Sequence, residues 1–294
     1  MKNFREVLES GEFTITAECG PPKGTDIKEM LEHARHLLGK IHGINVTDNQ
    51  SAVMRIASLP VCRLLHEMGH DPILQMTCRD RNRLALQSDL LGAYILGIRN
   101  VLCMTGDHVS AGDHKSAKTV YDIESVQLLR VVDGLNHGKD MAGNDLKGPT
   151  KLFPGAVVTP ESNPIEPQLI KFEKKIKAGA RFFQTQAIYD IPKFRKFMKV
   201  ARNFDVKILA GILLLKNAGM ANYLNKFVPG ITVPESLIEE LKAAGKEEAL
   251  DKGIDIAARQ IRELKDDKVC DGVHIMAIGL ENKVPIIMEK AGLL

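Results

Sequence analysis

The sequence lacks any apolar run that approaches the ~20 consecutive residues needed to cross a bilayer. Residues 1–13 also lack the uninterrupted apolar segment of a signal peptide, because Lys2, Arg5, Glu6 and Glu9 interrupt them. We therefore expect a soluble cytoplasmic protein that has no membrane partner.

Cysteine motifs and an excess of one charge are also missing. The five cysteines are odd in number and form no C-x-x-C pair, so we expect no disulfide framework and a reducing compartment. The 40 basic and 37 acidic residues leave a net charge of only +3, which predicts no nucleic-acid partner. With 44% hydrophobic residues, the chain is typical of a globular protein with a substantial core.

Short apolar segments alternate with helical segments along the whole chain. We expect strands at residues 13–18, 43–48, 71–78, 100–107 (with a closing turn), 154–161, 181–189, 207–213 and 273–278. After an N-terminal helix, we expect helices at 25–39, 51–68, 84–98, 122–132, 167–178, 191–203, 217–227, 246–265 and 282–291.

Eight strands alternating with helices favour a single (β/α)₈ TIM barrel, one domain spanning residues 1–294. A doubly wound sheet is the alternative. The phosphate-binding patterns G-x-G-x-x-G and G-x-x-x-x-G-K-[ST] are both absent, however, and the barrel is therefore preferred.

Ligands bind at the carboxyl ends of the strands in such a barrel, so polar residues that close each strand are candidate site residues. They are Glu18, residues 47–50, Thr77, residues 105–107, residues 159–161, Gln186 and Gly211. Several polar groups that converge in this way suit a polar, ring-containing ligand.

Three of these residues each allow two interpretations. In a partly dry pocket the Glu18 carboxyl would retain a proton and suit general acid catalysis; otherwise it is a solvated turn carboxylate. Asp107 allows the same two interpretations, and its place before a long polar loop favours function. The amide of Gln186 must either face the barrel mouth or find buried partners.

One apparent metal motif is interpreted as a coincidence. His66-Glu67-Met68-Gly69-His70 matches H-E-x-x-H, which binds zinc when both histidines share one face of a continuing helix. Gly69 is expected to end the helix within the motif, and the segment precedes a strand, at the end of the barrel away from the catalytic face. We therefore predict no metal site.

Five segments, in order, resemble the methylenetetrahydrofolate reductase family. They are Ala-Glu-Cys-Gly-Pro-Pro at 17–22, Asn-Val-Thr-Asp-Asn-Gln at 45–50, Met-Thr-Cys at 76–78, Thr-Gly-Asp at 105–107 and Gly-Val-His-Ile-Met-Ala at 272–277. The resemblance implies a flavin-dependent TIM barrel that binds FAD and reduces 5,10-methylenetetrahydrofolate to 5-methyltetrahydrofolate. The length resembles the bacterial form. The segments Val-Thr-Asp-Asn-Gln at 46–50 and His-Ile-Met-Ala-Ile at 274–278 are similar to a branch of the family found in anaerobic one-carbon metabolism.

The resemblance also implies roles for individual residues. Glu18 would be the general acid that protonates N10 of the folate and opens its five-membered ring to an iminium. Asp107 would lie beside the flavin and the pterin, and Gln186 would contact the folate. The positions that match FAD-binding residues are Thr47, Gln75, Thr105, Gly106, Asp107, Tyr121, Asp122, Thr159, Asn163 and Lys175. Lys175, which by itself is most simply part of a solvated helix face, thereby gains a phosphate-binding role.

The chain departs from many family members at several positions. Gln75, Thr105 and Thr159 stand where many members have His, Arg and Tyr. Ala218 stands where some members use Phe to stack on folate or nicotinamide, and residues 279–281 replace an Asn-Arg pair that helps to hold the folate tail.

The resemblance implies NADH, NADPH or a partner redox protein as the electron donor. It also implies a homo-oligomer or a complex with a second subunit. Two alternative functions stay open: a flavin-carrying subunit that is active only with a partner protein, and a non-redox pterin-binding methyltransferase barrel.

Overall fold

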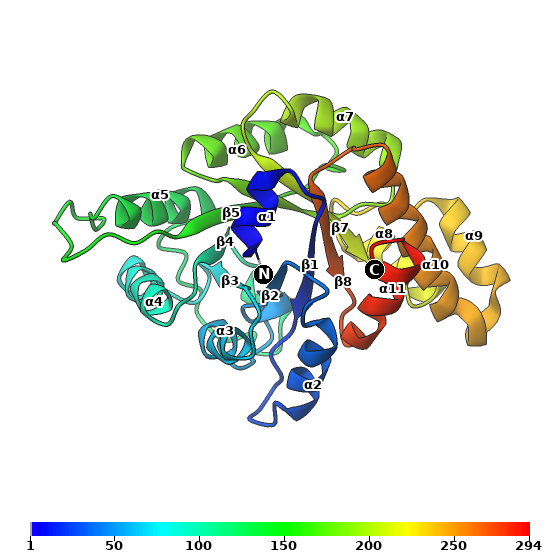
Figure 1. The fold of residues 1–294 in the computed structure, drawn as a ribbon, viewed down its shortest axis with the longest axis horizontal. Coiled ribbons are helices and arrows are strands. Elements are labelled where there is room, and N and C mark those ends of the chain that lie inside the picture. Colours follow the sequence, from blue (N-terminus) through cyan, green and yellow to red (C-terminus); the bar gives the residue numbers. More distant parts are fainter. Residues whose placement is uncertain (1) are drawn as a thin grey trace.

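Eight parallel strands close into one barrel in the computed structural model of the protein, which describes residues 2–294 (Figure 1). Strands that are consecutive in the sequence are hydrogen-bonded neighbours, and β8 pairs with β1. The strands are β1 (Thr14–Cys19), β2 (Gly43–Val46), β3 (Pro72–Thr77), β4 (Asn100–Met104), β5 (Phe153–Val158), β6 (Phe182–Ala187), β7 (Lys207–Leu213) and β8 (Gly272–Met276). The predicted (β/α)₈ TIM barrel is confirmed, and the doubly wound alternative is wrong.

Helices surround the barrel. They are α1 (Phe4–Ser10), α2 (Lys28–Leu37), α3 (Ser58–Glu67), α4 (Arg83–Ile95), α5 (Ser125–Asn136), α6 (Glu166–Lys177), α7 (Ile191–Ala201), α8 (Ala218–Phe227), α9 (Glu235–Ala243), α10 (Gly245–Asp266) and α11 (Val284–Lys290), with short 3₁₀ turns η1 (Gln50–Ala52), η2 (Val109–Ala111) and η3 (Glu281–Lys283). Within residues 2–294, none of the helices combines the length and the apolar composition that a bilayer crossing requires.

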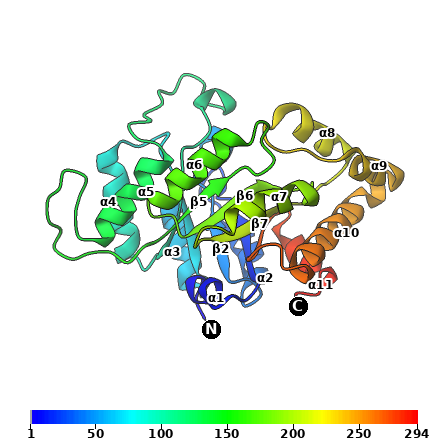
Figure 2. The same ribbon diagram turned by 90° about the horizontal axis from the view of Figure 1, so that it is seen from above.

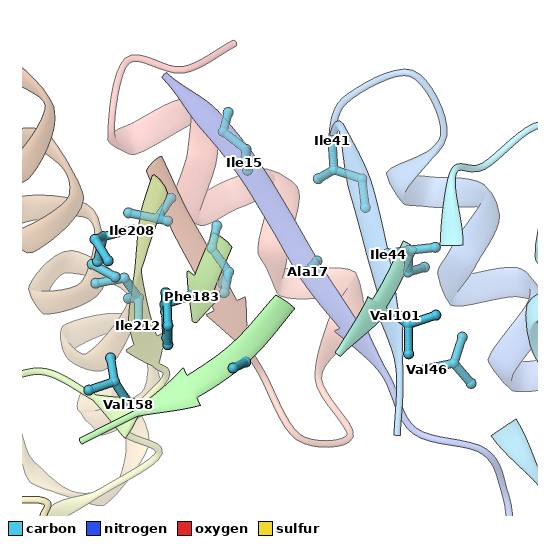
Figure 3. Close-up of a cluster of buried hydrophobic side chains, with 14 of the residues drawn as sticks. Ile15, Ala17, Ile41, Ile44, Val46, Val101, Val158, Phe183, Ile208 and Ile212 are labelled. Atoms are coloured by element: carbon cyan, nitrogen blue, oxygen red, sulfur yellow. The ribbon is translucent and has the colours of Figure 1, made fainter. Parts of the chain in front are cut away.

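The main core lies between the strands and the surrounding helices. Figure 3 shows part of this layer, in which Ile44, Val46 and Ile212 lie on the outer face of their strands. All three are fully buried. Apolar residues dominate this face because helices cover a parallel sheet and exclude water from it.

Helix α1 closes the amino-terminal end of the barrel. Phe4 and Leu8 pack inside the barrel with Phe153 and Phe182, and the rings of Phe4 and Phe182 meet edge to face with centroids 5.1 Å apart. Gly155 makes room for this packing, since an added Cβ would lie 2.2 Å from the Phe182 ring. In Figure 2, α1 lies at one end of the barrel and α8 near the other, so access to the interior is left to the carboxyl ends of the strands.

Two predicted helices differ from the structure. The helix expected from residue 51 begins at Ser58 instead, because residues 50–52 form η1 and Ser51 and Ala52 have positive φ angles of 55° and 58°. In α4, Leu84 and Ile95 fall at helical spacing but are 73% and 83% exposed. No prediction covered α9, which forms a second core with α8.

The H-E-x-x-H segment does not lie on one continuing helix. Helix α3 ends at Glu67, as Gly69 predicted, and Gly69 has a φ of 96°. Nε2 of His70 lies 2.9 Å from the Ala34 carbonyl oxygen. Among residues 2–294, no three His, Cys, Asp or Glu side chains gather as potential metal ligands.

Candidate active site

Glu18 is a buried carboxylate at the carboxyl end of β1, where only 8% of the residue is exposed. Nε2 of Gln50, from the loop after β2, donates to Glu18 Oε1 over 3.2 Å. Nε2 of His274, from β8, lies 3.8 Å from Glu18 Oε2. The burial argues against a solvated turn carboxylate, and partners from both neighbouring strands hold the side chain in place.

A layer of polar side chains fills the barrel interior next to Glu18. Asn45 and Gln184 exchange two hydrogen bonds of 2.6 and 3.0 Å across the barrel, from β2 to β6. Gln184 Nε2 also lies 3.3 Å from Thr16 Oγ1, and Nδ1 of His274 lies 3.0 Å from the same oxygen. These four residues are at most 3% exposed, so their polar atoms need one another as hydrogen-bond partners in place of water.

The Thr16 hydroxyl fixes the orientation of the His274 ring. Thr16 Oγ1 donates to the Val273 carbonyl over 3.3 Å and lies 3.0 Å from Nδ1 of His274. Nδ1 is thus directed at Thr16, and Nε2 faces the Glu18 carboxylate at 3.8 Å, which is longer than a hydrogen bond. His274 is therefore a polar neighbour of Glu18.

Asp48, which follows β2, joins the ends of β2 and β3. Its Oδ2 accepts hydrogen bonds of 2.9 Å from both the backbone N–H and the hydroxyl of Thr77. Arg81 binds both carboxylate oxygens, at 2.8 and 3.0 Å. All of these hydrogen bonds are made to other residues of the chain, so Asp48 stabilises the carboxyl end of the barrel.

Asp107 lies in an exposed turn at the carboxyl end of β4. Gly106 bends the chain there with a φ of 90°, and its carbonyl accepts a hydrogen bond of 3.1 Å from the Tyr121 hydroxyl. Nη1 of Arg79 donates to the Asp107 carbonyl over 3.3 Å. Because β1 and β4 are parallel strands of one barrel, Glu18 and Asp107 stand at the same end of it.

A cavity of about 270 Å³ lies between the end of β4 and the start of α5. Its lining includes Thr105, Tyr121 and Asp122, three of the residues that the resemblance assigns to FAD. Arg83 binds both carboxylate oxygens of Asp122 and lowers the pKa of Asp122 to about 2. A larger cavity, of about 440 Å³, lies between α6 and α7; its lining includes Pro160 from the predicted segment 159–161, but none of the residues that the resemblance assigns to FAD or folate.

Thr47 and Gln75 lie buried at the ends of β2 and β3. The Thr47 hydroxyl oxygen is buried and has no hydrogen-bond partner among residues 2–294. Gln75 is 8% exposed, and no side-chain hydrogen bond of its amide is found within the same residues. Buried polar atoms are normally paired, so the Thr47 hydroxyl is suited to a bound polar molecule.

The remaining predicted residues surround the end of β5 and the helix that follows it. Thr159 is half-buried, and Asn163 is exposed and precedes a cis proline. Lys175 is 8% exposed, and its Nζ donates to the Val157 carbonyl over 2.6 Å. Burial lowers the pKa of Lys175 to about 8. The side chain is therefore not part of a solvated helix face.

Gln186 and Gln184 have opposite surroundings although they are two residues apart in β6. Gln186 is exposed, whereas Gln184 is buried and paired with Asn45. A register shift between β6 and β7 lies between Gln184 and Ala187. Among residues 2–294 the Gln186 side chain has no buried partner, so its amide is open to a ligand.

Glu161, which follows β5, binds backbone rather than ligand. Its Oε1 accepts hydrogen bonds of 3.0 Å from the N–H groups of Tyr189 and Asp190, and its Oε2 accepts one of 3.2 Å from Thr232. Burial raises the pKa of Glu161, although these three donors oppose the shift. This carboxylate joins three loops at the carboxyl end of the barrel.

Sequence reasoning missed two residues that the structure places at the site. His274 lies within a strand, and only its inward direction beside Glu18 reveals it. Arg79 follows β3 in a run of alternating charges, which is usually a solvated turn, yet its side chain is only 2% exposed. The available signal was position: both residues lie at or near the carboxyl end of a strand.

A family model described as methylenetetrahydrofolate reductase matches residues 3–292. The chain belongs to the methylenetetrahydrofolate reductase family. It is similar to methylenetetrahydrofolate reductase 2 of Schizosaccharomyces pombe, at 27% identity over 98% of this chain and 46% of that protein. It is also similar to 5,10-methylenetetrahydrofolate reductase of Pectobacterium carotovorum subsp. carotovorum, at 26% identity over 73% of this chain and 70% of that protein. The chain spans about half the length of the S. pombe relative.

One solved structure has a fold similar to that of this chain. An uncharacterized protein from Clostridium thermocellum, described as binding two copies of 5-methyl-5,6,7,8-tetrahydrofolic acid, gives a TM-score of 0.66. The match covers 98% of this chain and 96% of that one, at 16% sequence identity. At this identity the likeness concerns the fold alone.

Proposed function

We propose that this chain is an FAD-dependent enzyme that reduces 5,10-methylenetetrahydrofolate to 5-methyltetrahydrofolate, with the barrel as a single flavoprotein domain. The observation that carries the proposal is Glu18, a buried carboxyl at the mouth of the barrel with Gln50 and His274 as its polar neighbours. Membership of the family and the folate bound by the C. thermocellum protein of the same fold support the substrate class.

The residues at the barrel mouth fit FAD. The Thr47 hydroxyl is a buried oxygen without a partner among residues 2–294, and a polar group of the cofactor would satisfy it. Thr105, Tyr121 and Asp122 line a cavity beside the same rim. We infer that these residues hold FAD together with Gln75, Gly106, Asp107, Thr159, Asn163 and Lys175. When bound and reduced by the electron donor, FAD would supply the hydride for the reduction.

The protein's own contribution to the chemistry is to deliver a proton. The Glu18 carboxyl transfers its proton to N10 of the folate while the bond between N10 and the methylene carbon breaks, and the electron pair of that bond remains on N10. The product of this step is an iminium that accepts a hydride at the methylene carbon. A positioned general acid of this kind typically contributes ~10²–10⁴ to the rate.

Asp107 and Gln186 are suited to hold the folate. Both are exposed at the carboxyl end of the barrel: Asp107 follows β4, and Gln186 lies in β6, two strands further around the barrel. The pterin ring carries amide and amino groups that match a carboxylate and a side-chain amide. NADH or NADPH is the electron donor that we propose; activity that requires a partner subunit would instead favour a partner redox protein.

The test begins with the visible spectrum of the purified protein. We expect the spectrum of bound flavin, loss of its absorbance on anaerobic addition of NADH or NADPH, and its return when methylenetetrahydrofolate is added. A colourless protein that binds no added FAD would contradict the proposal and favour a non-redox pterin-binding barrel.

The variant Glu18→Gln then tests the general acid. Flavin content and flavin reduction by the donor should persist, while reoxidation by the folate slows roughly 100-fold or more. Glu12→Gln is the matched control, because Glu12 is an exposed carboxylate beside the opposite end of β1. Folate turnover that is unchanged in Glu18→Gln would remove Glu18 from this role.

A further inference from the structure

We propose that Arg79 is a positioning residue that holds the two loops of the active site, one carrying Gln50 and the other Asp107, in a single arrangement. This inference rests on the proposed function for its catalytic consequence. Its structural part concerns only the chain's own loops and can be tested without substrate.

The guanidinium of Arg79 lies between the two loops and binds both. Nη1 donates to the Asp107 carbonyl and Nη2 donates to the Asn49 carbonyl, each over 3.3 Å. Nε and Nη2 also bind the two carboxylate oxygens of Asp80, at 2.8 and 2.7 Å. The arginine side chain is only 2% exposed, so these contacts replace its hydration.

The two loops need an external restraint, because their backbone conformations are sparsely populated. On the first loop, Asn49, Ser51 and Ala52 have φ angles of 45°, 55° and 58°. Such residues persist only where the surrounding structure holds them. Asn49 directly precedes Gln50, the residue that donates to Glu18, so the Arg79–Asn49 contact controls where that donor lies.

The second loop is held against the same side chain. Gly106 has a φ of 90°, and an added Cβ would lie 3.2 Å from the Arg79 Cβ. The N–H of Val120, where the long loop after β4 returns, donates to the Arg79 carbonyl over 2.8 Å. Arg79 thus contacts both ends of that loop as well as the loop after β2, and the geometry of Asp107 depends on it.

Arginine is required because its side chain must bind one carboxylate and two separate backbone carbonyls that lie in different directions. A guanidinium presents five N–H donors in a rigid plane, so it can bind a carboxylate and two separate carbonyls at once. An ammonium is a compact charge at the end of a flexible stem. Arg79→Lys therefore retains the positive charge beside Asp80 and loses the simultaneous contacts to Asn49 and Asp107.

The structural test is backbone hydrogen exchange of the purified chain, measured by mass spectrometry. We expect Arg79→Lys to exchange at least tenfold faster than wild type in residues 49–55 and 106–120, with the rest of the barrel unchanged. Arg63→Lys is the matched control, since Arg63 also binds a carboxylate and a backbone carbonyl, those of Glu67 and Leu96, but lies on α3 away from the barrel mouth. Equal exchange in Arg79→Lys and wild type would overturn the inference.

The catalytic test compares kcat and KM for methylenetetrahydrofolate in a wild type that has first been shown to be active. We expect Arg79→Lys to lower kcat/KM at least tenfold and to change the pH profile of kcat, because both Gln50 and Asp107 shift. Flavin reduction by the donor should remain within about twofold. A wild type without folate reduction would defeat the proposed function, and the exchange result would still decide the role of Arg79.

A second variant covers the case in which Arg79→Lys does not fold. Asp80→Asn leaves the arginine in place and removes the charge that anchors its guanidinium. We expect the same two loops to exchange faster, by a smaller factor than in Arg79→Lys. If exchange in both loops is unchanged in Asp80→Asn, Arg79 does not position them.

Discussion

Nε2 of His274 lies 3.8 Å from Oε2 of Glu18, and both side chains are almost completely buried. The second ring nitrogen of His274 is occupied by the Thr16 hydroxyl oxygen, 3.0 Å away. The imidazole therefore presents Nε2 to the carboxylate, which makes His274 the polar neighbour of Glu18 on the side of β8.

Replacing His274 by Gln should slow folate reduction by about 10-fold to 100-fold, because the Glu18 carboxyl loses the imidazole that faces its Oε2. Stopped-flow spectroscopy of the flavin separates the two half-reactions, and we expect the donor half-reaction to be unchanged. His42→Gln provides the control, since His42 accepts a hydrogen bond from the Ile15 N–H elsewhere on β1. Equal folate rates in the two variants would exclude a role for His274.

Gln184→Leu should lower the free energy of unfolding by about 1–3 kcal/mol, because it leaves the buried amide of Asn45 without its partner. Urea denaturation measures this difference. The double variant Asn45→Leu/Gln184→Leu should lose less than the sum of the two single variants, since it removes both polar groups together. Losses that simply add would indicate that the two amides are not coupled.

Lys175 should make stability depend on pH in the alkaline range. Burial lowers the pKa of Lys175 from 10.5 to about 8, so between these values the unfolded chain holds a proton that the folded protein has released. The unfolded state then binds more protons, and the contribution of Lys175 to the unfolding free energy rises with pH, by about 3 kcal/mol in total. Below pH 8 both states are protonated and the cost of burying the ammonium is fully present.

Urea denaturation of wild type and Lys175→Met between pH 7 and pH 10 measures this contribution. The advantage of the variant over wild type should be largest at pH 7 and should shrink above pH 8. Lys174→Met, which changes an exposed residue of the same helix, should parallel wild type throughout. A constant difference between Lys175→Met and wild type would contradict the burial of a charged amine.

Gly155→Ala should destabilise the fold by about 1–3 kcal/mol, because the new methyl group would lie 2.2 Å from the Phe182 ring inside the barrel. Gly92→Ala is the opposite case, since nothing lies within 4 Å of an added Cβ at that position in α4. That variant should gain up to about 1 kcal/mol from helix propensity. Thermal unfolding of both variants checks the contrast.

Local patterns in the sequence were sufficient for the architecture. Each strand is a short apolar segment that ends at a turn signal, as Gly20-Pro21-Pro22 ends β1, and such signals act over a few residues. The same patterns placed Glu18 and Asp107 at strand ends, and parallel strands put those ends on one side of the barrel. Helical spacing alone did not show which face of α4 is covered, and Leu84 and Ile95 share that spacing yet are largely exposed.

The chain by itself therefore determined that a barrel forms and at which end the candidate site lies. Only the closed tertiary structure decided which polar side chains meet inside it. Asn45 and Gln184 are 139 residues apart, and Arg79 lies about 30 residues from each carbonyl that it binds. All of these contacts depend on closure of the barrel. The Asn45–Gln184 pair also depends on strand register, because a shift of one residue would turn each of these two side chains to the opposite face of its strand.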